Sequence, residues 1–179
     1  MRHLLHNAPE SSGLSSQYSF FGLIFLETPN SKKLRQTRNS NLWLQFQTLI
    51  LLPAVGLLLR VLGFWRSYKF LKRISQFHLR RSGKFDQPLS EAIRIGNIVG
   101  STNKKISLYL ATCLPESLTL WYILRRKGLD ANLCLGARTV TGEFEAHAWV
   151  EFDQVVLNDD QDINIRYEPF DIDSADKKK

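Results

Sequence analysis

The chain has 179 residues, 44% of them hydrophobic, and carries a formal net charge of +7. This length fits one domain of ordinary size with appendages, and the apolar content argues against wholesale disorder. The basic charge suits an acidic peptide, an anionic membrane surface or nucleic acid. Nucleic acid is disfavoured because no zinc-finger spacing, RNP motif or convincing helix-turn-helix is present.

The cysteine count and the absence of targeting and nucleotide-binding motifs limit the possible compartment and cofactors. Two cysteines are too few for a disulfide framework, and residues 1–19 lack the apolar core of a secretory signal. We therefore expect a cytoplasmic, reducing compartment in which both thiols stay free. Neither a P-loop nor a G-x-G-x-x-G motif is present, so no nucleotide or other cofactor is expected.

The first 88 residues predict two regions. Residues 1–39 are rich in serine, asparagine and charge, which predicts a poorly ordered arm. Residues 40–88 predict a helical region, and from Leu42 to Trp65 its only charge is Arg60. The apolar run is borderline for a bilayer span, and Pro53 is expected to kink or split it. We favour a buried or amphipathic helical layer, with peripheral membrane contact through residues 42–74 as the alternative.

An amphipathic pattern follows. Its apolar positions recur at spacings of three and four, which predicts one helical stripe: Val61, Phe64, Trp65, Tyr68, Leu71 and Ile74. Arg66, Lys69 and Arg73 fall on another face. This basic face is either simply solvated or a cationic surface for an acidic peptide or anionic lipid.

A short helix is expected next. Residues 81–87 predict a loop, and Ser90 is a candidate N-cap for a helix from Glu91 to about Val99. Gly100 is expected to end this helix, and residues 101–105 to form a turn.

The clearest helix runs from about Cys113 to Lys127. Thr112 is its candidate N-cap, Pro115 lies in its first turn, and Gly128 is its stop. At a helix N-terminus, unpaired N–H groups and the helix dipole favour a thiolate and can face a developing oxyanion. Cys113 is thus a candidate nucleophile, although a small buried apolar role is an equal alternative on position alone.

Two strands follow, over residues 131–138 and 144–152, joined by a turn at residues 141–143. The second alternates strictly, which places His147 on the face opposite an aliphatic stripe. Asp153 and Gln154 predict a hairpin turn into residues 155–157. Asp159 then lies near the mirror position of His147, so a helix-start cysteine, a histidine and an aspartate are expected to form a nucleophile, a base and an orienting carboxylate.

The remaining candidates have simpler interpretations. Cys134 lies mid-strand between leucines, which favours core packing over chemistry. Zinc ligation by Cys113, Cys134, His147 and Asp159 is disfavoured because no C-x-x-C or H-x-x-x-H spacing is present. Trp149 either packs, shields the site or holds a substrate side chain. Gly136 either permits a close backbone approach or relaxes its strand.

Four motifs now carry a family resemblance: TCLPESL (112–118), LRRKGLDANLCLGAR (124–138), FEAHAWVEF (144–152) and VLND (156–159). Together they resemble the transglutaminase-like cysteine proteases of lasso-peptide maturation, in the stand-alone leader-peptidase form. The resemblance covers residues 90–159 well and the preceding helical region more loosely. It implies a papain-like α+β core with Cys113 as nucleophile, His147 as base and Asp159 as orienting carboxylate.

The expected fold is therefore α+β: a nucleophile helix on a small antiparallel sheet, preceded by a helical region. The expected boundaries are 1–39 for the arm, 40–88 for the helical region, 89–170 for the peptidase core and 171–179 for a charged tail. The resemblance implies a peptidase that removes the leader from a ribosomally made precursor. Its implied partners are a small leader-recognition protein and an ATP-dependent cyclase. A transglutaminase-like acyltransferase and a catalytically silent precursor-binding scaffold are the alternatives.

Overall fold

The computed structural model describes residues 31–79, 85–106, 113–170 and 172, with side chains from residue 38 except those of residues 77–79. The chain divides into two units, Met1–Gln36 and Thr37–Lys179, and the second unit holds every described element apart from the start of the first helix. The Thr112 cap, residues 81–84 of the expected loop, residues 1–30 of the arm and nearly all of the charged tail lie outside the described residues.

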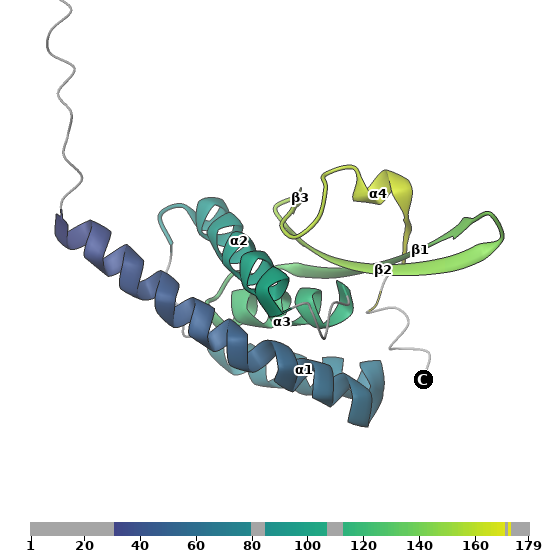
Figure 1. Cartoon of the computed structure of the whole chain (residues 1–179), viewed down its shortest axis with the longest axis horizontal. Helices are drawn as coiled ribbons and strands as arrows, with labels where there is room; N and C mark the ends of the chain where they lie inside the picture. Colours follow the sequence, from purple (N-terminus) through teal and green to yellow (C-terminus); the bar gives the residue numbers. More distant parts are fainter. Residues whose placement is uncertain (1–30, 80–84, 107–112, 171, 173–179) are drawn as a thin grey trace, which may run out of the picture. The chain divides into compact units, whose positions relative to one another are not determined.

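Helices come first along the chain and strands later (Figure 1). The elements are α1 (Ser31–Leu79), α2 (Pro88–Ile106), α3 (Cys113–Arg126), β1 (Asn132–Val140), β2 (Glu143–Phe152), β3 (Val155–Val156), α4 (Ile163–Arg166) and β4 (Glu168–Phe170). The strands form one sheet in the order β3-β2-β1-β4, and every neighbouring pair is antiparallel. The predicted α+β class, with a helix from Cys113 beside a small antiparallel sheet, is confirmed.

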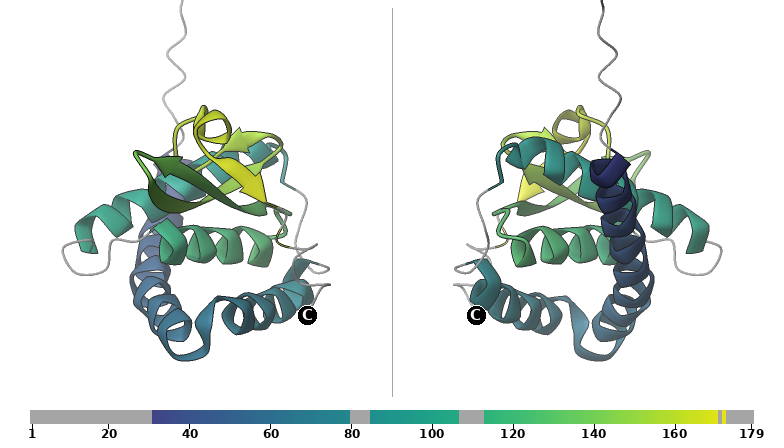
Figure 2. Two further views of the ribbon diagram at one scale, coloured as in Figure 1. Left: turned by 90° about the vertical axis from the view of Figure 1, so that its right-hand side faces the viewer. Right: turned by 90° about the vertical axis from the view of Figure 1, so that its left-hand side faces the viewer.

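Helices cover both faces of the sheet (Figure 2). On the α3 face, Leu133 and Val150 pair across β1 and β2 and join a core that includes Leu118. On the opposite face, Trp149 forms a smaller cluster with Ile163 of α4. The two faces follow directly from the strict alternation of the strands, because neighbouring side chains point to opposite sides.

The predicted turns after α3 and after β2 are confirmed. Gly128 has φ 86°, and the Leu129 N–H donates to the Leu124 carbonyl at 3.0 Å, so this glycine ends α3 in the left-handed conformation. Asp153 and Gln154 both have positive φ, 49° and 65°, which matches the twist that a two-residue hairpin requires.

The prediction for α2 was wrong at both ends. The helix begins at Pro88, before Ser90, and continues through Gly100 to Ile106. Thr102 and Asn103 are buried, and the Asn103 side chain donates to the Glu116 carboxylate of α3. Packing on α3 therefore carries the helix past the glycine, which a local pattern does not reveal. The short elements α4 and β4 were not predicted either.

The break in α1 also differs from the prediction. The backbone stays helical through Pro53 and departs from helical angles at Gly63, with φ 73° and ψ 174°. Glycine adopts this conformation without a steric penalty. The break turns Val61 outward, where it is 71% exposed, while Tyr68 and Leu71 of the predicted stripe are buried.

The first arm of α1 is buried along one stripe only. Leu44, Leu52 and Val55 lie in the core. Within Arg38–Gln76, an 18-residue window is long and apolar enough to cross a membrane by length and composition, yet only 17% of it is buried. The expected buried layer is thus one face of the helix, and the other faces expose apolar side chains.

Candidate active site

The expected nucleophile and base face the same cavity. Cys113 is the first residue of α3, and His147 lies in the middle of β2. Both line a cavity of about 240 Å³ whose other walls are apolar. Gly136, which has no side chain, and the small Ala146 and Ala148 also line it, which leaves room in the cavity for part of a substrate.

His147 is held by a carboxylate and by two aromatic rings. Its Nε2 lies 2.6 Å from Oδ2 of Asp159. The imidazole stacks on Trp149, with ring centroids 6.4 Å apart, and on Tyr167 at 5.2 Å. Because the aspartate occupies Nε2, a neutral imidazole in this arrangement presents its Nδ1 lone pair as the proton acceptor.

Gly136 explains how these rings fit. It pairs with His147 across β1 and β2, and a Cβ on it would come within 2.9 Å of both Trp149 and Tyr167. The close-approach interpretation of this glycine is therefore the correct one. Trp149 is fully buried and donates from Nε1 to Glu151 at 2.8 Å, so it packs and orients the imidazole but has no surface for a substrate.

The Asp159 carboxylate is itself fixed. Its Oδ1 accepts the Asp160 N–H at 2.8 Å and lies 3.4 Å from the Arg166 guanidinium of α4. Side chains of the neighbouring Asp160 and Asp162 are 81% and 59% exposed, and both pair with Arg166. Among these three aspartates, it is Asp159 that meets the histidine.

A buried polar network links α3 to β2 and to the segment that carries Asp159. Ser117, one helical turn after Cys113 and fully buried, donates to the Ala148 carbonyl at 2.8 Å. It also accepts from Asn158 Nδ2 at 2.9 Å, and Asn158 Oδ1 accepts the Val150 N–H at 2.8 Å. Ala148 follows His147 in sequence, and Asn158 precedes Asp159. The network therefore fixes the positions of α3, β2 and the Asp159 segment relative to one another.

Comparison with known families agrees with this geometry. The model of the transglutaminase-like superfamily matches residues 55–170. The chain belongs to this superfamily. No curated protein and no solved structure matches the chain. The superfamily consists largely of enzymes, and cysteine proteases and acyltransferases are the classes that the match supports.

In this transglutaminase-like chain a second acid lies near the site. Burial raises the pKa of the Glu116 carboxyl above its ordinary value, and the Asp159 charge adds to that rise, whereas the Asn103 hydrogen bond opposes it. Through Asn103, Glu116 joins the end of α2 to the first turn of α3. It lies close enough to Asp159 and His147 for these two groups to influence its pKa.

The second cysteine has a different environment. Burial, reinforced by the Glu151 carboxylate, raises the pKa of the Cys134 thiol to about 12. Such a thiol stays protonated at neutral pH and is a poor nucleophile. Among the described residues, no group of three or more histidine, cysteine or acidic side chains is arranged to hold a metal ion.

Several residues of the site were not anticipated as such. They are Glu116, Ser117, Asn158, Arg166 and Tyr167. The i, i+4 spacing of Cys113 and Ser117 was a usable signal, because it places both on one side of the helix. Arg166 and Tyr167 carried no local signal, since α4 and β4 bring them to the site through tertiary packing.

Proposed function

We propose that this protein is a cysteine peptidase that removes the leader from a ribosomally made lasso-peptide precursor. The observation that carries the catalytic part is the hydrogen bond between His147 and Asp159 beside a cavity that Cys113 also lines. The substrate class is supported by the resemblance of the four motifs around Cys113, His147 and Asp159 to lasso leader peptidases.

The chemistry follows from these groups. The Cys113 sulfur attacks the scissile carbonyl carbon while Nδ1 of His147 takes the thiol proton. N–H groups at the start of α3 stabilise the oxyanion. His147 then gives its proton to the departing amine, which leaves an acyl thioester on Cys113. Water, deprotonated by His147, attacks the thioester and releases the acid and the thiol.

Asp159 holds the imidazole in the tautomer that this sequence requires and stabilises the imidazolium that forms. The reducing cytoplasm keeps the Cys113 thiol free for attack. In this function the protein works with a small leader-recognition protein, and an ATP-dependent cyclase closes the ring of the released core peptide.

Labelling tests the nucleophile. Iodoacetamide at neutral pH should modify Cys113 faster than Cys134, whose thiol burial keeps protonated. Peptide mapping by mass spectrometry gives the two rates, and the Cys113→Ala variant should lose the fast phase. Equal and slow labelling of both thiols would favour the silent scaffold.

Product analysis tests the reaction. A candidate precursor, the recognition protein and this chain are incubated together, and the products are weighed by mass spectrometry. Leader and core peptides that together contain one added water indicate hydrolysis, whereas an amine-linked product indicates the acyltransferase. Cys113→Ala should lower the rate by at least about 10³-fold with its circular dichroism unchanged. Cleavage at the wild-type rate by this variant would disprove the assignment.

A further inference from the structure

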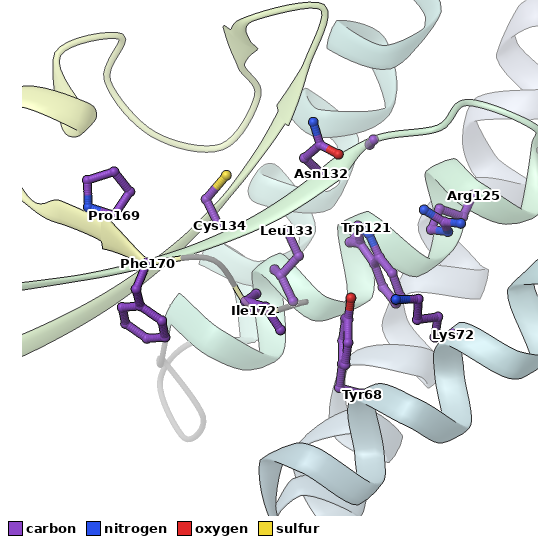
Figure 3. Close-up of a pocket in the computed structure, with 11 residues that line it drawn as sticks. Tyr68, Lys72, Trp121, Arg125, Asn132, Leu133, Cys134, Pro169, Phe170 and Ile172 are labelled. Carbon is purple, nitrogen blue, oxygen red and sulfur yellow. The ribbon is translucent and has the colours of Figure 1, made fainter. Parts of the chain in front are cut away.

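A second cavity, of about 450 Å³, adjoins the first (Figure 3). Its walls come from the second arm of α1, the end of α3, the start of β1 and β4. Phe170 of β4 lines both cavities, so they share a wall at this side chain.

The far end of this cavity is cationic. Lys72 lies over the Tyr68 ring at 5.3 Å from its centroid, and the Arg125 guanidinium lies over Trp121 at 5.2 Å. Figure 3 shows these side chains gathered at one end, away from Phe170. None of the eleven described residues that line the cavity is acidic.

Arg125 also forms an ion pair beside this cavity. Its Nη1 donates to Asp130 at 2.6 Å, but its buried Nε has no hydrogen-bond partner among the described residues. A carboxylate oxygen is the acceptor that an arginine guanidinium or a lysine ammonium binds most strongly.

The spacing of the two cavities can be read along β1. Gly136 lines the first cavity and Asn132 the second. Four residues of extended chain span roughly 13 Å. We infer that the second cavity binds an acidic side chain of the peptide substrate, about four residues from the bond that is cut. This inference rests on the proposed peptidase function.

Binding is tested without turnover. Fluorescent decapeptide libraries are made in which one position at a time is fixed as Glu or Gln and the others are randomised, and their affinity for the Cys113→Ala protein is measured by fluorescence polarisation. At one position we expect Glu to bind about tenfold more tightly than Gln, since a hydrogen bond to a charged group contributes that much.

Variants locate the preference. Lys72→Gln and Arg125→Gln should each bring the Glu-to-Gln ratio towards one. The matched control is Arg73→Gln, which removes the next, exposed cation of α1 without touching the cavity. No preference at any position, or a preference that Arg73→Gln removes equally, would overturn the inference.

Cleavage of the same libraries by the wild-type protein separates the two proposals. Cleavage that favours Glu about four residues from the cut supports both. Cleavage without any Glu preference overturns the acidic subsite and leaves the peptidase standing. A Glu preference in binding, with no cleavage even in the presence of the recognition protein, retains the anionic site and overturns the peptidase.

A separate observation concerns the outer face of α1. Its first arm exposes apolar side chains outside the buried stripe: Leu42 (58%), Trp43 (67%), Phe46 (53%), Leu49 (49%), Ile50 (53%), Leu57 (63%) and Val61 (71%). Trp43, Phe46 and Ile50 among them also line a hollow beside the end of α3. We call these seven side chains the outer apolar face. Leaving so many large apolar groups in water is unfavourable, and such a face marks an interaction surface.

The charge along the sequence of this helix is of one sign. Residues 28–85 contain twelve lysines and arginines and no acidic residue, which accounts for more than the whole net charge of +7. Arg38, Arg60 and Arg66 are exposed on α1 itself. Apolar side chains beside an all-cationic segment are the combination that anionic bilayers bind.

We also propose that the outer apolar face lies on an anionic membrane surface. The helix lies on the bilayer and does not span it, because Leu44, Leu52 and Val55 on its other side are held in the core. A second copy of the chain fits less well, since pairing this face with itself would bring two cationic segments together.

Vesicle flotation tests this surface. The full chain should float with phosphatidylcholine vesicles that contain one-third phosphatidylglycerol, and far less with pure phosphatidylcholine. Changing both Trp43 and Leu57 to Ser should weaken partition by about tenfold or more, because each buries a large apolar side chain in the interface. Phe144→Ser is the matched control, since Phe144 is 73% exposed on β2.

Three outcomes would overturn the membrane surface. They are binding that does not depend on anionic lipid, equal losses in the double variant and in Phe144→Ser, and a concentration-dependent dimer in sedimentation that the double variant abolishes. The last would assign the outer apolar face to a second copy of the chain.

Discussion

The site region and the first arm of α1 depart from the usual pattern of burial in opposite ways. Around Cys113, polar side chains are buried and bonded: Ser117 has two partners and Asp159 has three. Along the first arm of α1, large apolar side chains lie in water. The first pattern fixes positions, which catalysis needs, because small misplacements of reacting groups are costly. The second leaves surface available, which binding needs.

The largest expected effect is on catalysis, and it comes from a change to the bonded side chains of the site. Asp159→Asn should lower kcat by about 10²–10⁴-fold, because an amide can bond to His147 but cannot stabilise the imidazolium. Peptide cleavage or acyl-enzyme formation gives the measurement, with circular dichroism to show an intact fold. Asp160→Asn, whose side chain is 81% exposed, should retain activity. Equal losses in the two variants would contradict the role of Asp159.

The next prediction compares the two faces of α1. Leu52→Ala removes a side chain that is 1% exposed and should lower the free energy of unfolding by about 2–4 kcal/mol. Leu57→Ala changes a side chain that is 63% exposed and should alter it by less than about 0.5 kcal/mol. Urea titration measures both. Similar losses would mean that the outer apolar face is buried in the protein in solution.

A smaller effect on stability is expected from the two buried hydroxyls of α3, one with and one without a described hydrogen-bond partner. Ser117→Ala removes the acceptor of Asn158 Nδ2 and the hydroxyl that donates to the Ala148 carbonyl. This loss should lower the free energy of unfolding by about 1–3 kcal/mol. Thr119→Val removes a buried hydroxyl whose Oγ1 has no described partner and should be neutral or stabilising. Ser117→Ala should also lower kcat, because the segment that carries Asp159 loses a contact. If Thr119→Val cost as much as Ser117→Ala, the network would lack the assigned role.

The smallest effect concerns pH. Since the pKa of Glu116 is raised in the fold, its ionised form is disfavoured there, and the wild type loses stability as pH rises through that pKa. Glu116→Gln keeps an acceptor for Asn103 and removes this loss. The variant should therefore have the higher Tm at pH 7, and the difference should vanish below the ordinary value of 4.5. A constant difference across this range would show that ionisation is not its cause.

The sequence went furthest where local rules are strong. Period-two alternation placed His147 and Trp149 on one face of β2, and the turn chemistry of Asp153 and Gly128 ended the elements where the structure ends them. It was wrong at Gly100, where contact with α3 overrides a helix breaker, and at Pro53, through which α1 continues. The break at Gly63 depended on a backbone conformation that composition does not reveal.

By itself, the sequence determined the α+β class, the helix that starts at Cys113 and the hairpin that brings Asp159 near His147. These depend on spacing within a few dozen residues, where helix and strand periods and turn geometry suffice. Only the tertiary structure decided how the Asp159 carboxylate is held, that burial keeps the Cys134 thiol protonated and which faces of α1 remain in water. Those outcomes depend on burial and on partners from distant segments, namely Arg166, Glu151 and the buried stripe of α1.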